Sequence, residues 1–402
     1  ITVTHVNEQE QAVAAISGQL WDFWGAGAIG IAVGAEHRRE FTEGVGRTAG
    51  TGDRLLFLNT GADFAGAEYT SDEWFAEASI PLFRDSWLGE YAELSGSYRQ
   101  FDYSTAGEGD VYGVNLVWRP IGDITFKTSL NTSFRAPNLN ENFSPFNQTF
   151  GNNLVDPCTT NDIALQTAEI RTNRIANCQA LLAAYNAANG TTLAFDFAGL
   201  TPGNGDDFVL PAGGGRTYAS GIAGVLGGNP ALEPEESESF TFSTVLQPRF
   251  IPNLTVVLDY YEIKIENVIA NPLVGEIAAN CVNGPTLNPT ACNLIFRRNP
   301  GIPFGIGAPN GDPVGGFIQA PLNYAALQTR GLDFQARYSL DTEEVFGRNW
   351  GRFDYRVGGL WLIEQKRFLN PGNPSAFEEI SSDVQLPRVR LTSSLTWTPN
   401  DI

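Results

Sequence analysis

The sequence predicts an all-β protein, an antiparallel transmembrane β-barrel, and three observations support this fold class. Segments of alternating apolar and polar residues recur, each about a dozen residues long, whereas a strand of a soluble protein has ~5–6. The links between them alternate between tight turns and long loops. Barrels of the outer membrane sort their connections in this way, with short turns on one side and long loops on the other.

The segment Asp123 to Arg135 shows the alternation most clearly. Ile124 and Phe126 begin its apolar face, and Lys127 and Asn131 lie on the polar face. A tilted strand needs ~9–11 residues to cross a bilayer, and a Lys that faces lipid at mid-depth costs ~2–4 kcal/mol. The apolar face is therefore expected to meet lipid and the polar face to line a lumen. About eleven strands of this kind are expected, near residues 17–24, 27–41, 72–83, 87–103, 109–119, 123–135, 237–248, 253–268, 322–340, 349–366 and 384–398.

The connections set the expected topology. Tight turns are expected at 25–27, 84–87, 120–122 and 248–252, and long loops at about 42–71, 136–236 and 270–321. The turns would face the periplasm and the long loops the outside of the cell. Aromatic residues such as Trp118 and Trp397 precede turns, which favours girdles at the membrane interface over ordinary core aromatics.

Composition narrows the possible partners and compartment. The 402 residues include 45 acidic and 25 basic side chains, for a net charge of -20, which argues against nucleic acid as a partner. No apolar run reaches the ~18 residues that a membrane helix needs. Four cysteines form two close pairs, Cys158 with Cys178 and Cys281 with Cys292, one pair in each of the two longest loops.

The spacing of the cysteines favours two local disulfides made in an oxidising compartment. A zinc site is the alternative, but the chain has no CxxC motif, and neither of its two histidines lies near a cysteine. We therefore expect no metal site. The sequence also lacks the G-x-S-x-G, H-E-x-x-H and P-loop motifs, so enzymatic activity and a cofactor are not expected.

The loop at 136–236 contains two candidate functional segments. Residues 163–188 have helical spacing, and this helix is either a lid over the mouth of the barrel or a stabilising surface element. A polar, glycine-rich stretch follows, where side chains suit sugar hydroxyls or a cation and one aromatic ring can stack on a ligand; solvated loop is the alternative. Its candidate ligand-binding residues are Asn204, Asp206, Asp207, Arg216 and Tyr218.

Several segments together resemble the barrel of a TonB-dependent outer-membrane receptor. Residues 132–143 (TSFRAPNLNENF) resemble the segment where an outward strand enters a long external loop. Residues 229–240 (NPALEPEESESF) resemble the return motif, and residues 259–265 (DYYEIKI) and 327–334 (LQTRGLDF) resemble the next two strands. Residues 18–41 resemble an earlier hairpin of the same family.

The resemblance implies active import across the bacterial outer membrane. Such receptors have about twenty-two strands around a separate plug, and the TonB–ExbB–ExbD system drives uptake of an iron-siderophore, an oligosaccharide or a similar ligand. No segment resembles the plug, the TonB box or the terminal aromatic strand, so residues 1–402 are expected to form about half of one barrel, embedded in outer-membrane lipid. The alternatives are a passive porin or surface adhesin and a secreted, soluble all-β hydrolase or sugar-binding protein.

Overall fold

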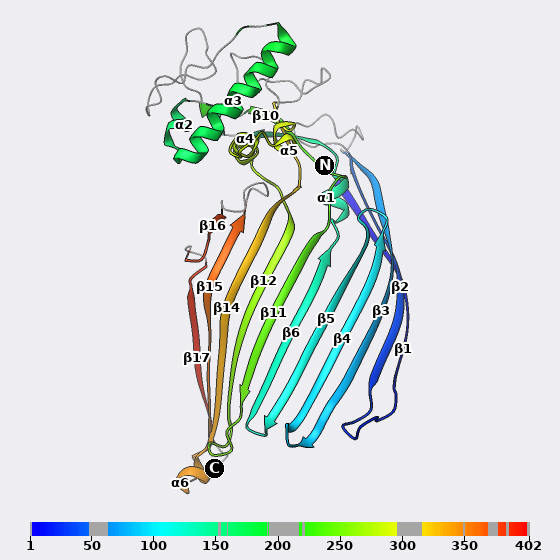
Figure 1. Cartoon of the computed structure of the whole chain (residues 1–402), viewed down its shortest axis with the longest axis vertical. Helices are drawn as coiled ribbons and strands as arrows, with labels where there is room; N and C mark the ends of the chain where they lie inside the picture. The colour runs from blue at the N-terminus through cyan, green and yellow to red at the C-terminus, as the bar shows by residue number, and fades with distance from the viewer. Residues whose placement is uncertain are drawn as a thin grey trace.

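The computed structural model describes residues 2–47, 63–151, 154–158, 160–190, 192, 217–218, 222–295, 316–348, 350–368, 377–382 and 386–399. Its main element is a 12-stranded antiparallel sheet (Figure 1). The strands are β1 (Thr2–Gln19), β2 (Gly30–Arg47), β3 (Phe64–Ser86), β4 (Gly89–Tyr103), β5 (Gly107–Ile121), β6 (Ile124–Arg135), β11 (Glu235–Leu246), β12 (Leu254–Ala270), β14 (Leu322–Asp341), β15 (Arg352–Phe368), β16 (Phe377–Glu379) and β17 (Val389–Thr398).

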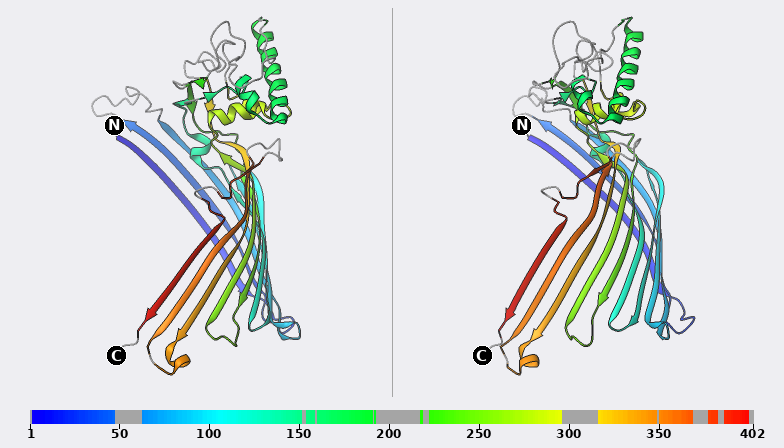
Figure 2. Two further views of the ribbon diagram at one scale, coloured as in Figure 1. Left: turned by 90° about the vertical axis from the view of Figure 1, so that its left-hand side faces the viewer. Right: turned by 60° about the vertical axis from the view of Figure 1, so that its left-hand side comes forward.

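From β1 to β16, each strand of this sheet pairs with the next strand of the sheet along the chain, even across the long loops. Strand β6 pairs with β11, and β12 pairs with β14. Strands β16 and β17 pair with different parts of β15, so they occupy one position and the described sheet has eleven positions. The sheet is curved and does not close on itself (Figure 2). The structure therefore confirms the predicted antiparallel architecture of a partial barrel.

The first strands extend further than the alternation predicted. We expected a strand near 17–24, but β1 begins at Thr2 and ends at Gln19, and the chain turns between Gln19 and Gly30. Asp22 organises this turn by accepting hydrogen bonds from the backbone N–H groups of Trp24 and Gly25. The beginning of β1 is polar on both faces, so it carries no period-two signal. The loop expected at 42–71 is shorter as well, because β2 reaches Arg47 and β3 begins at Phe64.

The two faces of the sheet differ in chemistry. The register places Glu36, Glu73, Asn115 and Lys127 on a polar face. On the opposite face, Phe126 packs beside the rings of Trp118 and Phe242. Further large apolar side chains exposed on that apolar face are Ile16, Val33, Trp74, Tyr98, Val114, Leu130, Phe240, Leu258, Trp361 and Leu391.

Three tryptophans near the short turns have paired indole N–H groups. The indole N–H of Trp24 donates to the carbonyl of Pro81 at 2.8 Å, that of Trp118 to Leu88 at 3.0 Å, and that of Trp397 to Trp350 at 2.8 Å. Each ring is otherwise at least 40% exposed. An exposed ring with a satisfied polar handle is the arrangement that favours a membrane interface.

The long loops contain most of the helices and the short strands. The long loop between β6 and β11 contains α1 (Leu139–Phe143), α2 (Thr160–Leu165) and α3 (Ala168–Asn189), with β7 (Asn147–Gly151), β8 (Leu154–Val155), β9 (Thr217–Tyr218) and β10 (Ile222–Leu226). The second of these two loops, between β12 and β14, contains α4 (Val274–Val282), α5 (Pro289–Cys292) and β13 (Ile318–Gln319). Helix α6 (Thr342–Phe346) lies in the turn after β14. No helix in the described part of the chain is long and apolar enough to cross a membrane.

The helix expected at 163–188 is two helices. Thr167 interrupts it, because its side chain accepts a hydrogen bond from the N–H of Ile170 and caps α3, while α2 ends at Leu165. Gly190 ends α3 in the left-handed conformation that glycine adopts without strain. Helices α4 and α5 of the second loop were not predicted from the sequence.

Helices α2 to α5 form one body, which we call the helical cap. It lies at the end of the sheet opposite the short turns (Figure 1), which we call the loop end. Disulfide Cys158–Cys178 fixes α3 to the segment before α2, and Cys281–Cys292 joins α4 to α5. All four sulfur-bearing residues lie in or against a single apolar cluster, which also contains Leu182, Ile277 and Phe317. Both disulfides expected from the spacing are therefore present.

Polar side chains join the two halves of the helical cap. The side-chain amide of Asn177 in α3 donates to the carbonyls of Val282 at 3.0 Å and Gly284 at 2.8 Å. Arg174 donates to the Asn283 side chain at 2.6 Å and pairs with Asp162 at 2.5 Å. Burial lowers the pKa of Arg174 although Asp162 faces it. Two loops that are far apart in the sequence are thus held together.

Candidate ligand-binding site at the loop end

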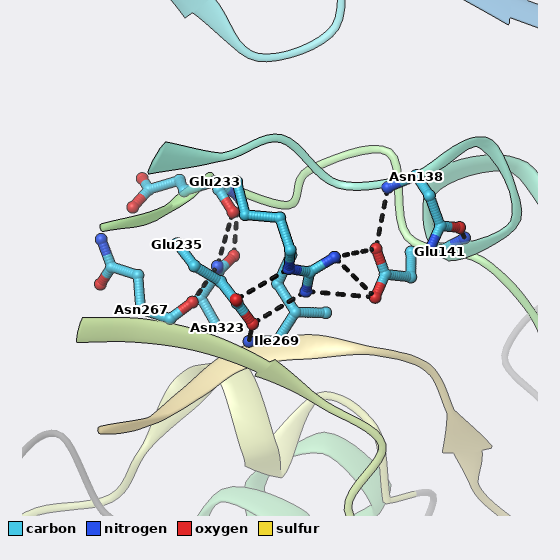
Figure 3. A network of polar contacts seen from close by, with 8 residues as sticks. Asn138, Glu141, Glu233, Glu235, Asn267, Ile269 and Asn323 are labelled. Carbon is cyan, nitrogen blue, oxygen red and sulfur yellow. Dashed lines mark hydrogen bonds and ion pairs between the residues drawn. The ribbon is translucent and has the colours of Figure 1, made fainter. Parts of the chain in front are cut away.

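Arg135, the last residue of β6, joins the three segments that meet at the loop end. Its guanidinium donates two hydrogen bonds to Glu235 of β11, at 2.7 and 2.8 Å, and three to Glu141 of α1, the shortest at 3.0 Å. Glu235 also accepts the backbone N–H of Ile269 in β12 at 2.8 Å. Figure 3 shows these carboxylates converging between the strands. A bidentate pair of this kind fixes orientation as well as distance.

Helix α1 begins at the same junction through a capping box. The side chain of Asn138 accepts the N–H of Glu141 at 2.9 Å, and the Glu141 carboxylate accepts the N–H of Asn138 at 2.8 Å (Figure 3). The returning chain passes close to this helix at Gly228, where a Cβ atom would lie 2.6 Å from the backbone carbon of Asn142. Only glycine fits this approach, so α1 and the return segment are held against each other.

On the other side of the junction, Asn323 connects the return segment to the following strands. Its side-chain N–H group donates to the carbonyls of Glu233 at 2.6 Å and Asn267 at 2.8 Å, and its oxygen accepts the N–H of Glu233 at 2.7 Å (Figure 3). The four segments at 132–143, 229–240, 259–265 and 327–334, whose sequences resemble receptor motifs, are neighbours in space as well, because their strands pair in this order.

A cavity of about 700 Å³ lies between this junction and the upper ends of β1 and β2. From the sheet it is lined by Asn7, Gln9, Glu40 and Thr42, and the Thr42 hydroxyl donates to the Asn7 side chain at 2.7 Å. The opposite wall comes from both long loops and includes Asn138, Asn140, Glu141, Asn147 and Asn271. A cavity of this volume falls in the range that holds small-molecule ligands.

Below the cavity, the polar face of the sheet has a network of paired charges. Glu36 accepts from Arg38 at 2.6 Å and from Arg99 at 2.9 Å, and the Arg99 guanidinium also pairs with Glu73 at 2.6 Å. Tyr103 donates to Glu73 at 3.1 Å. Glu36 and Glu73 are only 9% and 7% exposed, so the network is pre-organised rather than a set of loose surface pairs. It belongs to the wall, and its charges are internally balanced.

The residues predicted from the sequence to bind a ligand are not brought together in the described part of the structure. Asn204, Asp206, Asp207 and Arg216 lie outside the described residues. Tyr218 is in β9, where its backbone pairs with Leu154. These five assignments stay predictions. Among the described residues, no group of His, Cys, Asp and Glu side chains is arranged to hold a metal ion.

The asparagines that line the cavity were not predicted as site residues. Asn138 and Asn140 belong to the segment TSFRAPNLNENF, which was used only for its resemblance. Asn271 directly follows β12, and Asn7 lies in the polar half of β1. A local signal existed, namely asparagine at and just beyond strand ends, but which of these residues share a cavity depends on contacts between distant segments.

The long, curved sheet with one apolar and one polar face, together with the helices at its loop end, defines part of a membrane-spanning β-barrel. The family model for the β-barrel of TonB-dependent receptors matches residues 4–165 and 181–401. The chain therefore belongs to the TonB-dependent receptor family. This family and this fold fit the bacterial outer membrane.

Solved structures with the same fold include siderophore receptors. The siderophore receptor PirA from Acinetobacter baumannii matches with a TM-score of 0.54 and 11% identity, over 99% of this chain and 41% of that one. A variant of the ferric enterobactin receptor PfeA from Pseudomonas aeruginosa, in complex with enterobactin, matches with a TM-score of 0.54 and 13% identity, over 98% of this chain and 40% of that one. This chain thus spans about 40% of the length of these receptors. No curated protein matches the sequence.

Proposed function

We propose that this chain is the ligand-binding part of an outer-membrane receptor that imports a scarce nutrient with energy from the TonB–ExbB–ExbD system. The observation that carries the proposal is the cavity at the loop end, which is walled by the barrel on one side and by two long loops on the other. Membership of the TonB-dependent receptor family supplies the link to energised uptake.

The geometry supports capture rather than free passage. Helix α1 and the helical cap lie over the loop end, and α1 is anchored to the wall through Glu141 and Arg135. A general diffusion pore needs an open lumen, whereas a receptor needs a shaped mouth with fixed polar groups. A passive porin or surface adhesin is the alternative function.

Uptake in living cells distinguishes these functions. The source bacterium is compared with a strain lacking this gene and with a strain lacking TonB, using expression profiles under iron starvation and under growth on single sugars to choose the nutrient. Energised import predicts that both deletions abolish high-affinity uptake. If deletion of TonB leaves uptake unchanged while deletion of the gene removes it, the barrel is a passive pore and the proposal is wrong.

We further propose that the loop end faces the outside of the cell. Glu169 of α3 and Glu344 of α6 are both exposed and lie at opposite ends of the sheet. In intact cells, a maleimide that cannot cross membranes should label Glu169→Cys but not Glu344→Cys, and both should react after the outer membrane is opened. The reverse pattern in intact cells would invert the orientation.

A further inference from the structure

The cavity is lined by both polar and apolar residues, and amides are frequent among the polar ones, which bears on the class of ligand. Six side-chain amides line it, from Asn7, Gln9, Asn138, Asn140, Asn147 and Asn271. Two carboxylates, those of Glu40 and Glu141, also line it, whereas the register puts the side chain of Glu8 on the opposite face of the sheet. No Lys or Arg occurs among the lining residues that the structure describes. The cavity therefore offers many neutral hydrogen-bonding groups and an excess of negative charge.

The nearest guanidinium groups are already engaged. Arg135 is bound by Glu141 and Glu235, and Arg38 lies 2.6 Å from Glu36 and 3.8 Å from Glu40. Each of these two arginines already faces two carboxylates, so an anionic ligand would have to displace a carboxylate in order to pair with either of them. Two like charges about 4 Å apart near a protein surface repel each other by about 4 kcal/mol. The carboxylates of this wall therefore disfavour anionic ligands.

The side chain of Asn147 makes a single hydrogen bond within the wall. The side-chain oxygen of Asn147 is buried and accepts no hydrogen bond from any described residue, while its nitrogen donates to the carbonyl of Pro145 at 3.1 Å. Amides offer both donors and acceptors, which are the complement of a sugar's hydroxyl groups.

We infer that the cavity binds a neutral oligosaccharide rather than an anionic iron chelate. This inference rests on the proposed function, since it names the class of nutrient for the same site. The inferred ligand differs from that of the siderophore receptors that share the fold of this chain. Fold similarity at such low identity does not imply the same ligand. Binding at the cavity follows from the wall chemistry alone and holds whether or not uptake is energised.

The test measures binding by the intact receptor, purified from outer membranes in detergent. The probes are maltohexaose, cellohexaose, xylohexaose and mannohexaose as neutral glycans, and ferric enterobactin as an anionic chelate. At least one glycan is expected to bind with a Kd below about 1 mM and more tightly than ferric enterobactin. Its affinity should also stay constant as salt rises, because screening affects only charged ligands.

Variants locate the binding site. Asn140 in α1 and Asn271 after β12 are exposed and come from different loops, so replacing them leaves the wall intact. The double variant Asn140→Ala/Asn271→Ala is expected to weaken glycan binding about tenfold, since two hydrogen bonds are lost. Asn293→Ala, an exposed asparagine at the end of α5 and outside the cavity, is the matched control and should bind normally.

Three results would overturn the inference: no neutral glycan binds below about 1 mM, ferric enterobactin binds more tightly than every glycan, or the double variant binds as well as the control. Uptake is measured separately in cells with and without TonB. Glycan binding without TonB-dependent uptake would refute the proposed import and leave the ligand class standing, so the two failures are distinguishable.

Discussion

Val114 and Asn115 provide a direct test of which face of the sheet meets lipid. They are neighbours near the middle of β5, and the register puts their side chains on opposite faces. Val114 pairs with Leu130 on the apolar face and is 45% exposed. Asn115 pairs with Ser129 on the polar face, beside an open space of about 630 Å³. Lysine is placed at each position in turn.

The expected difference follows from the surroundings of the new charge. At Val114 the ammonium group would lie against acyl chains near mid-depth, at a cost of ~2–4 kcal/mol. That cost corresponds to roughly a 30- to 1,000-fold shift in the folding equilibrium at 1.4 kcal/mol per factor of ten. At Asn115 the same group has space and polar neighbours, as Lys127 of β6 already has, so the expected cost is below about 0.5 kcal/mol.

The measurement is reversible folding of the receptor into phosphatidylcholine vesicles, followed by tryptophan fluorescence across a guanidinium titration. Val114→Lys should lower the free energy of unfolding by several times more than Asn115→Lys. Val114→Ala is the control for lost apolar contact without charge. Equal destabilisation by the two lysines, or a larger effect at Asn115, would show that the facing assigned to every strand of the sheet is wrong.

Three further predictions concern the loop end. Arg135→Ala removes the shared partner of Glu141 and Glu235 and should destabilise the attachment of α1 by about 1 kcal/mol, a value that allows for the partial exposure of the Arg135 side chain. Hydrogen exchange should then become faster in α1 but not in β4. Cys158→Ser/Cys178→Ser should leave the barrel folded and make α3 protease-sensitive, because a disulfide closing a loop of this length contributes about 3 kcal/mol; unchanged protease resistance would contradict this. Asn177→Ala leaves two buried carbonyls of the second loop without their donor and should loosen α4 by about 1–3 kcal/mol, whereas Thr172→Ala, on the exposed side of α3, should have no such effect.

The strands in the membrane-spanning part were predictable because their signal is local. In β6, alternation alone placed Phe126 and Lys127 on opposite faces, and the structure confirms this through the rings beside Phe126. The polar beginning of β1 was missed for the same reason. Where both faces of a strand are polar, no alternation exists, and only pairing with β2 keeps these residues extended.

The architecture of the loop end depends on contacts between distant segments. The disulfides were predictable because each closes within one loop. The contact between the two loops was not predictable, since it depends on hydrogen bonds from Asn177 to Val282 and Gly284, which lie more than a hundred residues away in the chain. An asparagine in a helix carries no sign of such a role, because its preference for caps and turns is the same whether or not a partner lies opposite.

The cavity was not predictable either, because it too depends on contacts between distant segments. The same contacts explain why the wall around it is rigid. Arg135 is attached at once to α1, β11 and β12, through Glu141, Glu235 and the Ile269 N–H that Glu235 accepts. Each partner is a separate sequence segment, and none identifies the others. Once the three are joined, the asparagines of α1 are held at fixed positions against those of the sheet. Pre-organised polar groups lose little entropy when a ligand arrives, and hydrogen bonds to a neutral ligand are individually weak. A site of amides therefore needs the ionic junction beside it to bind at useful affinity.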